Sequence, residues 1–593
     1  MRIESSLGFD IKSFWKFTNS ARGISGLPNV MSFRNSLADN GQDIVDMFAT
    51  YFESVYVEPD NDNSDDELID NYTYSDINIS KLEITQMDVF EAIEKLNGKI
   101  GPGPDGLPSS FLKNCRTNIT PILHYLFNKF LNEGTFPSIW KRSFITPIHK
   151  ANERSDISNY RPISKLSTIP KLFESIVTNK LSGSLGNLLI DEQHGFRPKR
   201  STTTNLLTFQ HYTLEKLEKN AQVDVIYTDF SKVFDSVNHK MLLKKLKYLG
   251  IHGILLKWIE NYLVDRLQNV KYKSFISKDI NVKSGVPQGS HLGPLLFILF
   301  INDIKFKLSS CSFLMYADDL KLYSEIKSLQ DCITLQLNLD SLVSWCNVNK
   351  LQLNILKCKI MTFSRMRSNI NFQYSINGEI LETVSLMKDL GVLFDSKLKF
   401  SDHIDQIITK ATRLLGFIRR MTTNFTNPKS FRTLYLTLVR PILLYASSVW
   451  SPIYENHSKK LERIQHKFLN FVAWKLRLPS PRISHDYNQI ASLLDISSLK
   501  SHRYLNDLKF LYNLINNEID CIHLHSKLLL RVPKINLRNR ECNNFVVPIA
   551  KTNQFYHAPL WRMCNLADSL NIEFYSNEKC INQIKRALLI DYS

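Results

Sequence analysis

The sequence predicts an α+β fold, because strand-like and helix-like segments alternate in one part of the chain and helix-like segments alone fill another. Between about residues 223 and 394, short apolar runs rich in β-branched and aromatic residues are interleaved with amphipathic segments of helical period. After His403, apolar residues recur only at the three-to-four spacing of helices. A chain of 593 residues with 43% hydrophobic composition is long enough for several domains, each with its own core.

Residues 1–83 are interpreted as an N-terminal linker region that contains one amphipathic helix over residues 42–56. Seven of the thirteen residues from 58 to 70 are acidic, so this segment is expected to be flexible and solvated. Order is expected to resume with a helix over residues 84–96, where the apolar side chains again follow helical spacing.

Residues 84–398 are expected to form the mixed part of the fold, with a core at about residues 131–395. The expected helices cover residues 121–132, 240–249, 254–263 and 329–345, and the expected strands cover residues 223–230, 312–315, 320–323, 359–363 and 390–394. The strands at 312–315 and 320–323 are separated by a short turn, which predicts a hairpin.

A basic helical module is expected over residues 399–475, where Asn427 is a suitable N-cap and Pro428 suits the first position of a helix. Between Lys397 and Lys475, 14 basic residues outnumber 4 acidic ones. Such a module suits contact with the phosphate backbone of a duplex, although a solvated helical face would have the same composition. Residues 476–593 contain no motif that indicates a role.

Charge is distributed unevenly along the chain. Residues 1–100 contain 8 basic and 18 acidic residues, a net charge of −10. Because the whole chain has a net charge of +17, the remaining residues have a net charge of +27. A strongly basic body indicates a polyanionic partner, with nucleic acid first and an anionic membrane surface second.

Several classes of protein are disfavoured by the sequence. The longest apolar run, Pro294–Ile301, is far shorter than the roughly 20 residues that span a bilayer. The nine cysteines are scattered without a C-x-x-C pair, so neither a disulfide framework nor a zinc site is predicted, and Cys521-Ile-His-Leu-His525 alone is a weak metal candidate. Without an apolar stretch of signal-peptide type, the chain is expected to be intracellular.

Asp318 and Asp319 are adjacent carboxylates at the turn of the expected hairpin. Burying carboxylates is costly unless they are paired or bind a metal, and Mg²⁺ prefers carboxylate and phosphate oxygens. A plain surface turn, in which Asp-Asp favours the tight bend, is the alternative interpretation.

A third acid, Asp229, ends the apolar strand 223–230, where sheet enzymes place reactive groups. If this strand and the hairpin are neighbours, Asp229, Asp318 and Asp319 could hold two divalent ions roughly 3.5–4 Å apart. One ion would lower the pKa of an attacking 3′-hydroxyl, and the other would stabilise a leaving pyrophosphate. Asp235 competes with Asp229 for this role, and their spacing does not choose between them.

Between these acids lies a loop with three glycines and two prolines, Ser284-Gly-Val-Pro-Gln-Gly-Ser-His-Leu-Gly-Pro294. Such a backbone can approach a flat ligand closely, and Gln288 could hydrogen-bond a base or sugar edge. A simple strand-to-helix turn is the alternative.

Taken together, these motifs resemble those of reverse transcriptases from non-LTR (LINE-type) retrotransposons, most closely the jockey group of arthropods. Matching motifs follow the family's order across about four fifths of the chain. They are Gly101-Pro-Gly-Pro-Asp-Gly106, Phe136-Pro-Ser-Ile-Trp-Lys141, Asn159-Tyr-Arg-Pro-Ile-Ser164, Glu192-Gln-His-Gly-Phe-Arg197, Thr228-Asp-Phe-Ser-Lys-Val-Phe-Asp235, Gly285-Val-Pro-Gln-Gly289, Tyr316-Ala-Asp-Asp319 and Lys388-Asp-Leu-Gly-Val392. Val233 and Lys165 depart from residues usual in the family, but neither removes a chemical group.

The resemblance implies a right-hand polymerase of fingers, palm and thumb with an antiparallel palm sheet. Residues 84–398 would form fingers and palm, and residues 399–475 the thumb. The family's metal ligand is the first acid of its strand motif, which selects Asp229 over Asp235. Phe230 would add a backbone carbonyl to the metal site, and Phe234 would exclude a ribonucleotide's 2′-hydroxyl.

The resemblance also assigns residues that contact the incoming nucleotide. Arg161 would meet the triphosphate, and Gln288 with Gly289 would frame the nascent base pair. Lys357 would donate a proton to pyrophosphate, with Lys359 close enough in sequence to compete. Residues 388–392 match the primer grip.

The implied activity is RNA-directed DNA synthesis for a mobile element, with two Mg²⁺ ions that Mn²⁺ could replace. The implied partners are an RNA template, a DNA primer or nicked target DNA, and dNTPs, with no membrane and no zinc. Nuclear and cytoplasmic locations follow from the resemblance alone. Related elements usually encode an endonuclease first, and only 100 residues precede Gly101, so a truncated or partial product is expected.

Two alternatives remain at this point. The chain could be a decayed copy that binds nucleic acid without catalysis, although all three carboxylates are present. It could also be an RNA-dependent RNA polymerase or an intron maturase on the same palm, but Phe234 argues against the use of ribonucleotides.

Overall fold

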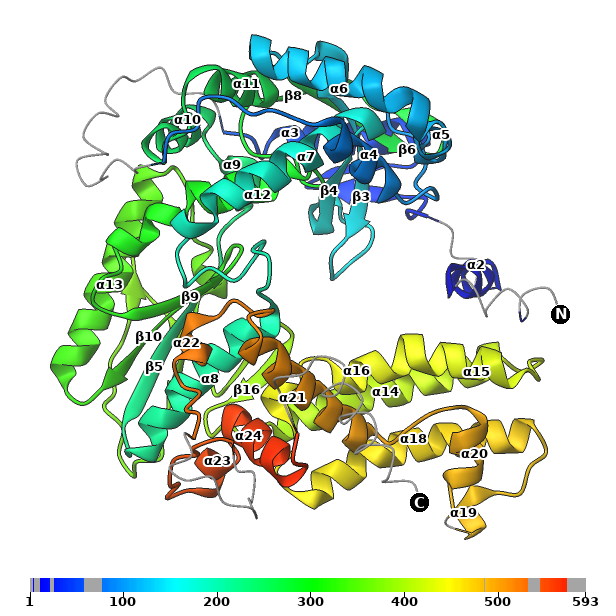
Figure 1. Cartoon of the computed structure of the whole chain (residues 1–593), viewed down its shortest axis with the longest axis vertical. Coiled ribbons are helices and arrows are strands. Elements are labelled where there is room, and N and C mark those ends of the chain that lie inside the picture. The colour runs from blue at the N-terminus through cyan, green and yellow to red at the C-terminus, as the bar shows by residue number, and fades with distance from the viewer. Residues whose placement is uncertain are drawn as a thin grey trace.

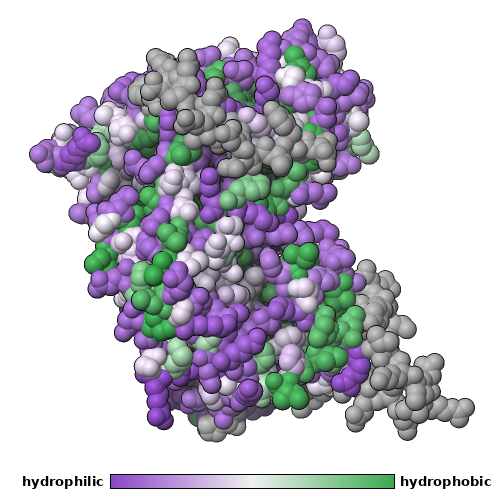
Figure 2. All heavy atoms as spheres, turned by 90° about the vertical axis from the view of Figure 1, so that its left-hand side faces the viewer, coloured by the Kyte–Doolittle hydropathy of each residue, from purple (hydrophilic) through white to green (hydrophobic). Residues whose placement is uncertain are grey.

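A computed structural model describes residues 4, 11–21, 26–57, 77–484, 486–531 and 544–572. The predicted acidic segment 58–70 lies outside these residues. In the view of Figure 1 the chain forms an open C, with a central sheet at the left, a mixed group of elements above and a helical group below. Figure 2 shows a largely hydrophilic surface that is hollowed between the upper and lower parts. In the described residues, no helix combines the length and apolarity needed to cross a bilayer.

The central sheet has five strands in the order β14-β11-β5-β10-β9. Its strands are β5 (Gln222–Thr228), β9 (Ser312–Tyr316), β10 (Asp319–Ile326), β11 (Lys359–Phe363) and β14 (Glu382–Thr383). β5 pairs antiparallel with both β10 and β11, and only the β11–β14 pair is parallel. Both the strand predicted at 223–230 and the predicted hairpin are therefore confirmed.

Both faces of β5 are covered, which explains its continuous apolar sequence. Val223 and Val225 share a core with α8 (Thr202–Glu218) and the C-terminal helices, whereas Ile226 packs into a second core. That second core includes α12 (Leu292–Phe300) and α13 (Leu329–Val348). Alternation along one strand thus builds two cores on opposite faces of the sheet.

The upper group is built around a second sheet in the order β4-β3-β6-β7, with β8 paired to β6. Its strands are β3 (Arg142–His149), β4 (Tyr160–Lys165), β6 (Arg266–Tyr272), β7 (Phe275–Ile276) and β8 (Ile280–Val282). The helices around it are α4 (Gln86–Glu94), α5 (Ser109–Asn114), α6 (Arg116–Glu133), α7 (Thr168–Leu185), α9 (Val233–Ser236), α10 (His239–Tyr248) and α11 (Gly253–Leu263). The helix predicted over residues 121–132 thus begins five residues earlier, and Pro121 lies inside it.

The described part of the N-terminal region is packed rather than free, which differs from the linker expected over residues 1–83. Helix α3 (Gly41–Glu53) and the hairpin of β1 (Met31–Phe33) and β2 (Ser36–Ala38) share a core with Ile145 and Val270 of the second sheet. Helix α2 (Ile11–Ala21) instead packs Phe14 and Trp15 against Phe417 in the helical group. Large apolar side chains on these helices explain why they dock.

The lower group is helical, as predicted from residue 403 onward. Its elements are α14 (Ser401–Met421), α15 (Pro428–Leu434), a π-helix (Tyr435–Val439), α16 (Arg440–Leu444), α17 (Ser447–Trp450), α18 (Glu455–Lys475), α19 (Pro481–Ser484), α20 (Asn488–Leu493), α21 (Leu499–Ile515), α22 (Ile522–His525), α23 (Asn553–Tyr556) and α24 (Pro559–Ser569). Asn427 caps α15 and Pro428 is its first residue, as the sequence predicted. Two small hairpins, β12 (Ser375–Ile376) with β13 (Glu379–Ile380) and β15 (Leu386–Asp389) with β16 (Val392–Asp395), precede it.

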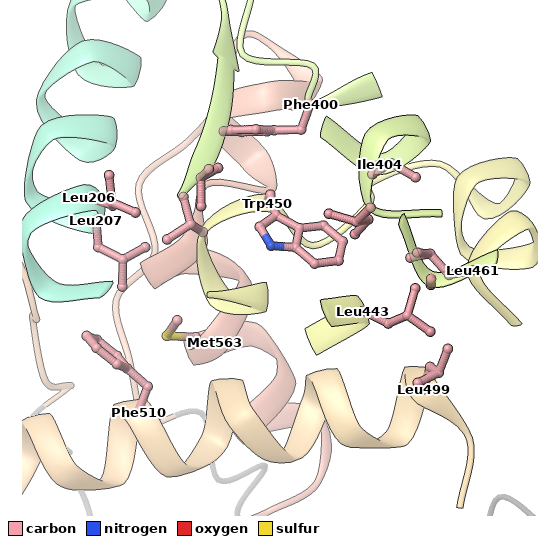
Figure 3. Packing of buried hydrophobic residues seen from close by; sticks show 14 of the residues in the cluster. Leu206, Leu207, Phe400, Ile404, Leu443, Trp450, Leu461, Leu499, Phe510 and Met563 are labelled. Atoms are coloured by element: carbon pink, nitrogen blue, oxygen red, sulfur yellow. The ribbon is translucent and has the colours of Figure 1, made fainter. Parts of the chain in front are cut away.

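The described residues beyond 476 belong to this core and do not form a separate unit. Figure 3 shows Trp450 at its centre, with Leu206 and Leu207 of α8 on one side and Phe510 and Met563 from the C-terminal helices below. The C-terminal helices therefore brace the sheet through α8.

Candidate active site

The strand register brings the three predicted acids to one end of the central sheet. β5 and β10 are antiparallel, with Thr228 opposite Leu320, and the Thr228 hydroxyl donates to the Leu320 carbonyl at 3.1 Å. Asp229 directly follows β5, and Asp318 and Asp319 lie where β10 begins. The structure thus brings together the carboxylates that the sequence placed at a strand end and a hairpin turn.

These carboxylates influence one another electrostatically. Burial, followed by the charges of Asp318, Asp389 and Asp229, raises the pKa of Asp319 to about 6. Burial is also the main cause that raises the pKa of Asp318, and the charge of Asp229 adds to it. The three carboxylates therefore give the site a negative electrostatic potential.

Three cationic side chains, those of Lys357, Lys150 and Arg161, partly offset this negative potential. The Lys357 ammonium lies 2.9 Å from Asp229 Oδ2. Lys150 is close enough to feel both Asp229 and Asp318, but burial and the charges of Arg161 and Lys357 lower its pKa. Sequence reasoning missed Lys150, although it directly follows β3, the hairpin partner of the strand that carries Arg161.

Lys359 faces a different partner from Lys357. Its ammonium lies 2.5 Å from Glu382 on β14, at the far side of β11 from β5. The geometry therefore places Lys357, and not Lys359, against the acid cluster.

The donor set suits hard cations, since it consists of carboxylate oxygens. Among the described residues, no three His, Cys, Asp or Glu side chains converge into a ready-made metal-ligand group. Instead, the Lys357 ammonium stands against Asp229 where a cation would bind. Carboxylate oxygens are chemically suited to a divalent ion, but in this structure the Asp229 carboxylate pairs with Lys357 instead of converging with Asp318 and Asp319.

The turn that carries Asp318 is held by the loop Gln193–Gly195. Gln193 Oε1 accepts hydrogen bonds from the amides of Ala317 at 2.9 Å and Gly195 at 2.7 Å. Ala317 has a positive φ of 57°, and a Cβ atom on Gly195 would collide with its backbone nitrogen. The family motif at residues 192–197 thus has a physical role here that the sequence did not reveal.

Asp235 lies apart from the three acids. Gln288 Nε2 lies 2.8 and 2.9 Å from its two carboxylate oxygens, and the Ser284 hydroxyl donates to its carbonyl. Burial raises the pKa of Asp235 to about 6. On geometry, Asp229 and not Asp235 joins Asp318 and Asp319.

The loop predicted to frame a base pair packs against the second sheet. The Gln288 carbonyl accepts from the Ser164 amide at 2.8 Å, and Gly289 has a φ of +110°, with the Ser164 carbonyl so close that a side chain would not fit. The Gln288 side chain is already engaged with Asp235. Its role in this structure is therefore to fasten the loop.

Two phenylalanines follow Asp229 closely in the sequence. Phe230 is buried and its backbone bridges Leu353. Phe234 is half-buried, with its ring centroid 4.2 Å from that of Phe297 and 5.9 Å from that of Phe196. This packing fixes the Phe234 ring in one orientation beside the strand end.

The β15–β16 turn is joined to the site from two directions. The Asp389 carboxylate forms a buried ion pair with the Lys321 ammonium on β10. From the helical group, the Tyr445 hydroxyl donates to the Leu390 carbonyl at 2.9 Å and its ring closely contacts Gly391. The turn therefore connects the acid-bearing sheet to the basic helices.

Comparisons with known proteins show what the chain is similar to. Residues 148–418 match the family described as "Reverse transcriptase (RNA-dependent DNA polymerase)", and this range contains every acid and base discussed above. The "Probable RNA-directed DNA polymerase from transposon BS" of Drosophila melanogaster is 28% identical over 404 residues, which are 65% of this chain and 44% of that protein.

Two further relatives are each described as "RNA-directed DNA polymerase from mobile element jockey". The Drosophila melanogaster protein is 28% identical over 412 residues, 66% of this chain and 44% of that protein. The Drosophila funebris protein is 28% identical over 436 residues, 69% of this chain and 47% of that protein. The chain thus spans less than half the length of these relatives.

Proposed function

We propose that the chain extends a DNA 3′ end with dNTPs on an RNA template, because residues 148–418 match a reverse transcriptase family and the chain is similar to RNA-directed DNA polymerases of the transposon BS and the mobile element jockey. The primer would be a DNA strand or a nicked target DNA. The observation that supports the proposal is the β5–β10 register, in which Thr228, directly before Asp229, pairs with Leu320, directly after Asp319.

In this proposal Asp229, Asp318 and Asp319 hold two Mg²⁺ ions, or Mn²⁺, through their carboxylate oxygens. Bound there, the ions would supply activation of the primer 3′-hydroxyl and neutralisation of charge on the triphosphate and the leaving pyrophosphate. The carbonyl of Phe230 is the proposed backbone ligand, since the neighbouring hydrogen bonds use the carbonyl of Asp229 and the amide of Ser231.

The cations around the acids would bind and orient the nucleotide. Arg161 and Lys150 would contact the triphosphate, because a guanidinium matches phosphate geometry and both lie near the acids. Lys357, which lies beside Asp229, would donate a proton to the departing pyrophosphate. Holding charged reactants in line supplies most of the rate in such reactions.

Phe234 would select the sugar of the nucleotide. Its ring is held against Phe297 and cannot easily swing away, so a 2′-hydroxyl would meet a fixed surface. Gly289 would let the backbone approach the base pair, while Gln288 would act through the loop that it fastens to Asp235.

The same proposal assigns the large parts of the molecule. Residues 84–398 would form fingers and palm, residues 399–475 a thumb that grips the duplex, and the β15–β16 turn a primer grip. The described residues beyond 476 would support the palm through α8, since their helices share its core.

Primer extension tests the proposal. Purified chain on poly(rA)·oligo(dT) with Mg²⁺ and dTTP is expected to extend the primer, and Asp318→Asn is expected to remove the activity. Asp340→Asn is the matched control, because Asp340 is a solvent-exposed acid on α13. No extension by the unaltered chain, together with intact binding of the primer–template, would favour the alternative of a catalytically silent nucleic-acid-binding copy.

A further inference from the structure

A cluster of basic side chains lies away from the acid cluster. A cavity of about 210 Å³ is lined by four basic side chains, Arg365, Lys397, Lys399 and His457, and no carboxylate lines it. The other lining residues are Ile404, Pro452, Ile453, Tyr454 and Gln554. We propose that this cavity binds a phosphate group.

The cavity is remote from the proposed active site. Arg365 lies two residues beyond the end of β11, where Phe363 pairs with Val223 near the start of β5. Asp229 follows the opposite end of β5, six residues away, which corresponds to about 20 Å along a strand. One bound phosphate group could not contact both places, so this site is separate.

Two of the basic side chains present buried nitrogen atoms without hydrogen-bond partners in the described part of the chain. These atoms are Nη1 of Arg365 and Nδ1 of His457. The other terminal nitrogen of Arg365 is bonded to Gln554, whose own amide donates to the Lys397 carbonyl at 2.6 Å. Gln554 thus fixes the guanidinium at the cavity, and Arg365 Nη1, whose only charged neighbour is Glu218 Oε2 at 4.0 Å in the described part of the chain, makes no hydrogen bond there.

The two lysines supply the remaining charge. Lys397 and Lys399 are exposed, and neither ammonium forms an ion pair with a carboxylate in the residues that the structure describes. The Asp395 carboxylate accepts the backbone amides of Lys397 at 3.0 Å, Lys399 at 3.1 Å and Phe400 at 2.7 Å. That acid therefore folds the loop that presents both lysines.

Other nearby acids are either engaged or directed elsewhere. Glu218 lies 4.0 Å from Arg365 but accepts the Thr552 hydroxyl at 2.5 Å and its amide at 3.3 Å. Asp402 and Glu455, in the first turns of α14 and α18, are exposed and do not line the cavity. The balance of charge at the cavity therefore stays positive.

Two helix starts reinforce this potential. Helices α14 and α18 are each 21 residues long, and both begin at the cavity without a side-chain N-cap hydrogen bond. The positive ends of their dipoles favour an anion. Phosphate is the anion that best uses a guanidinium, two ammonium groups and an imidazole around one small space.

The phosphate could be free in solution or part of a polynucleotide, and the experiment separates these sources. The full chain is titrated with inorganic phosphate by calorimetry and with a fluorescent single-stranded oligo(rU) by anisotropy. The variant Lys397→Gln/Lys399→Gln is compared with Lys99→Gln/Lys129→Gln, a matched loss of two exposed lysines in the upper group. Equal thermal unfolding of the three proteins verifies that each is folded.

We expect the cavity variant alone to weaken phosphate binding by about tenfold, which corresponds to losing one good charge-assisted contact. If inorganic phosphate does not bind but oligo(rU) binding falls only in the cavity variant, the site is supported and its ligand is a polynucleotide phosphate. If inorganic phosphate and oligo(rU) each bind the cavity variant and the control variant equally, the proposal is overturned. None of these readouts depends on polymerase activity.

Discussion

The buried ion pair between Lys321 and Asp389 offers the sharpest test of how the site is built. Its side chains are 4% and 7% exposed, and the Lys321 ammonium lies 4.7 Å from the centroid of the Phe209 ring. Replacing Lys321 by Met keeps the side-chain length but leaves Asp389 as a buried carboxylate without its partner. Breaking such a pair typically costs about 3–5 kcal/mol, whereas replacing both members by apolar residues is often neutral.

The cycle therefore compares Lys321→Met, Asp389→Leu and the double variant. Each single variant is expected to lower the calorimetric unfolding midpoint by on the order of 10 °C if the sheet unfolds as one domain of about 150–250 residues, for which the shift is about 2–4 °C per kcal/mol. The double variant is expected to recover most of that loss. Lys216→Met is the control, since its ammonium pairs with the more exposed Glu325 and such pairs contribute about 1 kcal/mol or less.

The same cycle has a readout at the acid site. Lys321 lowers the pKa of Asp319 and Asp389 raises it, so Lys321→Met should move the acid limb of the activity profile to higher pH. Asp389→Leu should move it to lower pH. A double variant that is destabilised by the sum of the single effects would refute the argument, because the two charges would then not compensate each other.

Three further predictions concern single residues at the site. Phe234→Ala should admit ribonucleotides and reduce the preference for dNTPs, as incorporation of rUTP against dTTP would show; unchanged selectivity would remove its assigned role. The raised pKa of Asp319 means that the folded state binds a proton on this carboxyl more tightly than the unfolded state does. The protonated carboxyl therefore contributes to folding stability at low pH, and this contribution is lost as the pH rises through about 6. Asp319→Asn should therefore abolish extension yet raise the unfolding midpoint more at about pH 7.5 than at about pH 5; the gain is limited because Asp319, although crowded by surrounding protein, still has solvent-exposed surface. Tyr445→Phe removes the hydroxyl that bonds Leu390, worth about 1 kcal/mol, and should raise KM for primer–template about fivefold with little change in kcat, whereas Tyr125→Phe, at an exposed tyrosine of α6, should change neither.

Local patterns of apolar residues in the sequence were sufficient to predict much of the fold. The apolar spacing between Ile404 and Ile418 predicted α14, because one buried face recurs every three to four residues. The continuous apolar run before Asp229 predicted a buried strand, and the turn at Asp318 and Asp319 predicted the hairpin. Carboxylates at strand ends are informative because, in an antiparallel pair, the last residue of one strand lies beside the first residue of its neighbour.

Other features depend on contacts between distant segments and leave little local signal. Lys150 looks like an ordinary surface lysine until the β3–β4 hairpin brings it beside Arg161. The engagement of Gln288 by Asp235 joins residues 53 positions apart, so no spacing rule would find it. The strand expected at 390–394 begins only at Val392 as β16, because Leu390 and Gly391 form a tight turn with positive φ, and Tyr445 hydrogen-bonds to this turn.

Three segments outside the hairpin contact the acid site through side-chain and backbone groups. Gln193 fixes the left-handed Ala317 that aims Asp318, the Asn354 amide holds the Asp229 carbonyl at 2.8 Å, and Lys321 anchors the turn that lies beside Asp319. Each support lies in a different sequence region, so a change in any one should disturb one carboxylate before the others. Because the carboxylates repel one another, the supports must oppose a force that would otherwise spread them apart. In the proposed function, the rigidity of these supports would therefore help to keep the three carboxylates close enough together to act on one nucleotide.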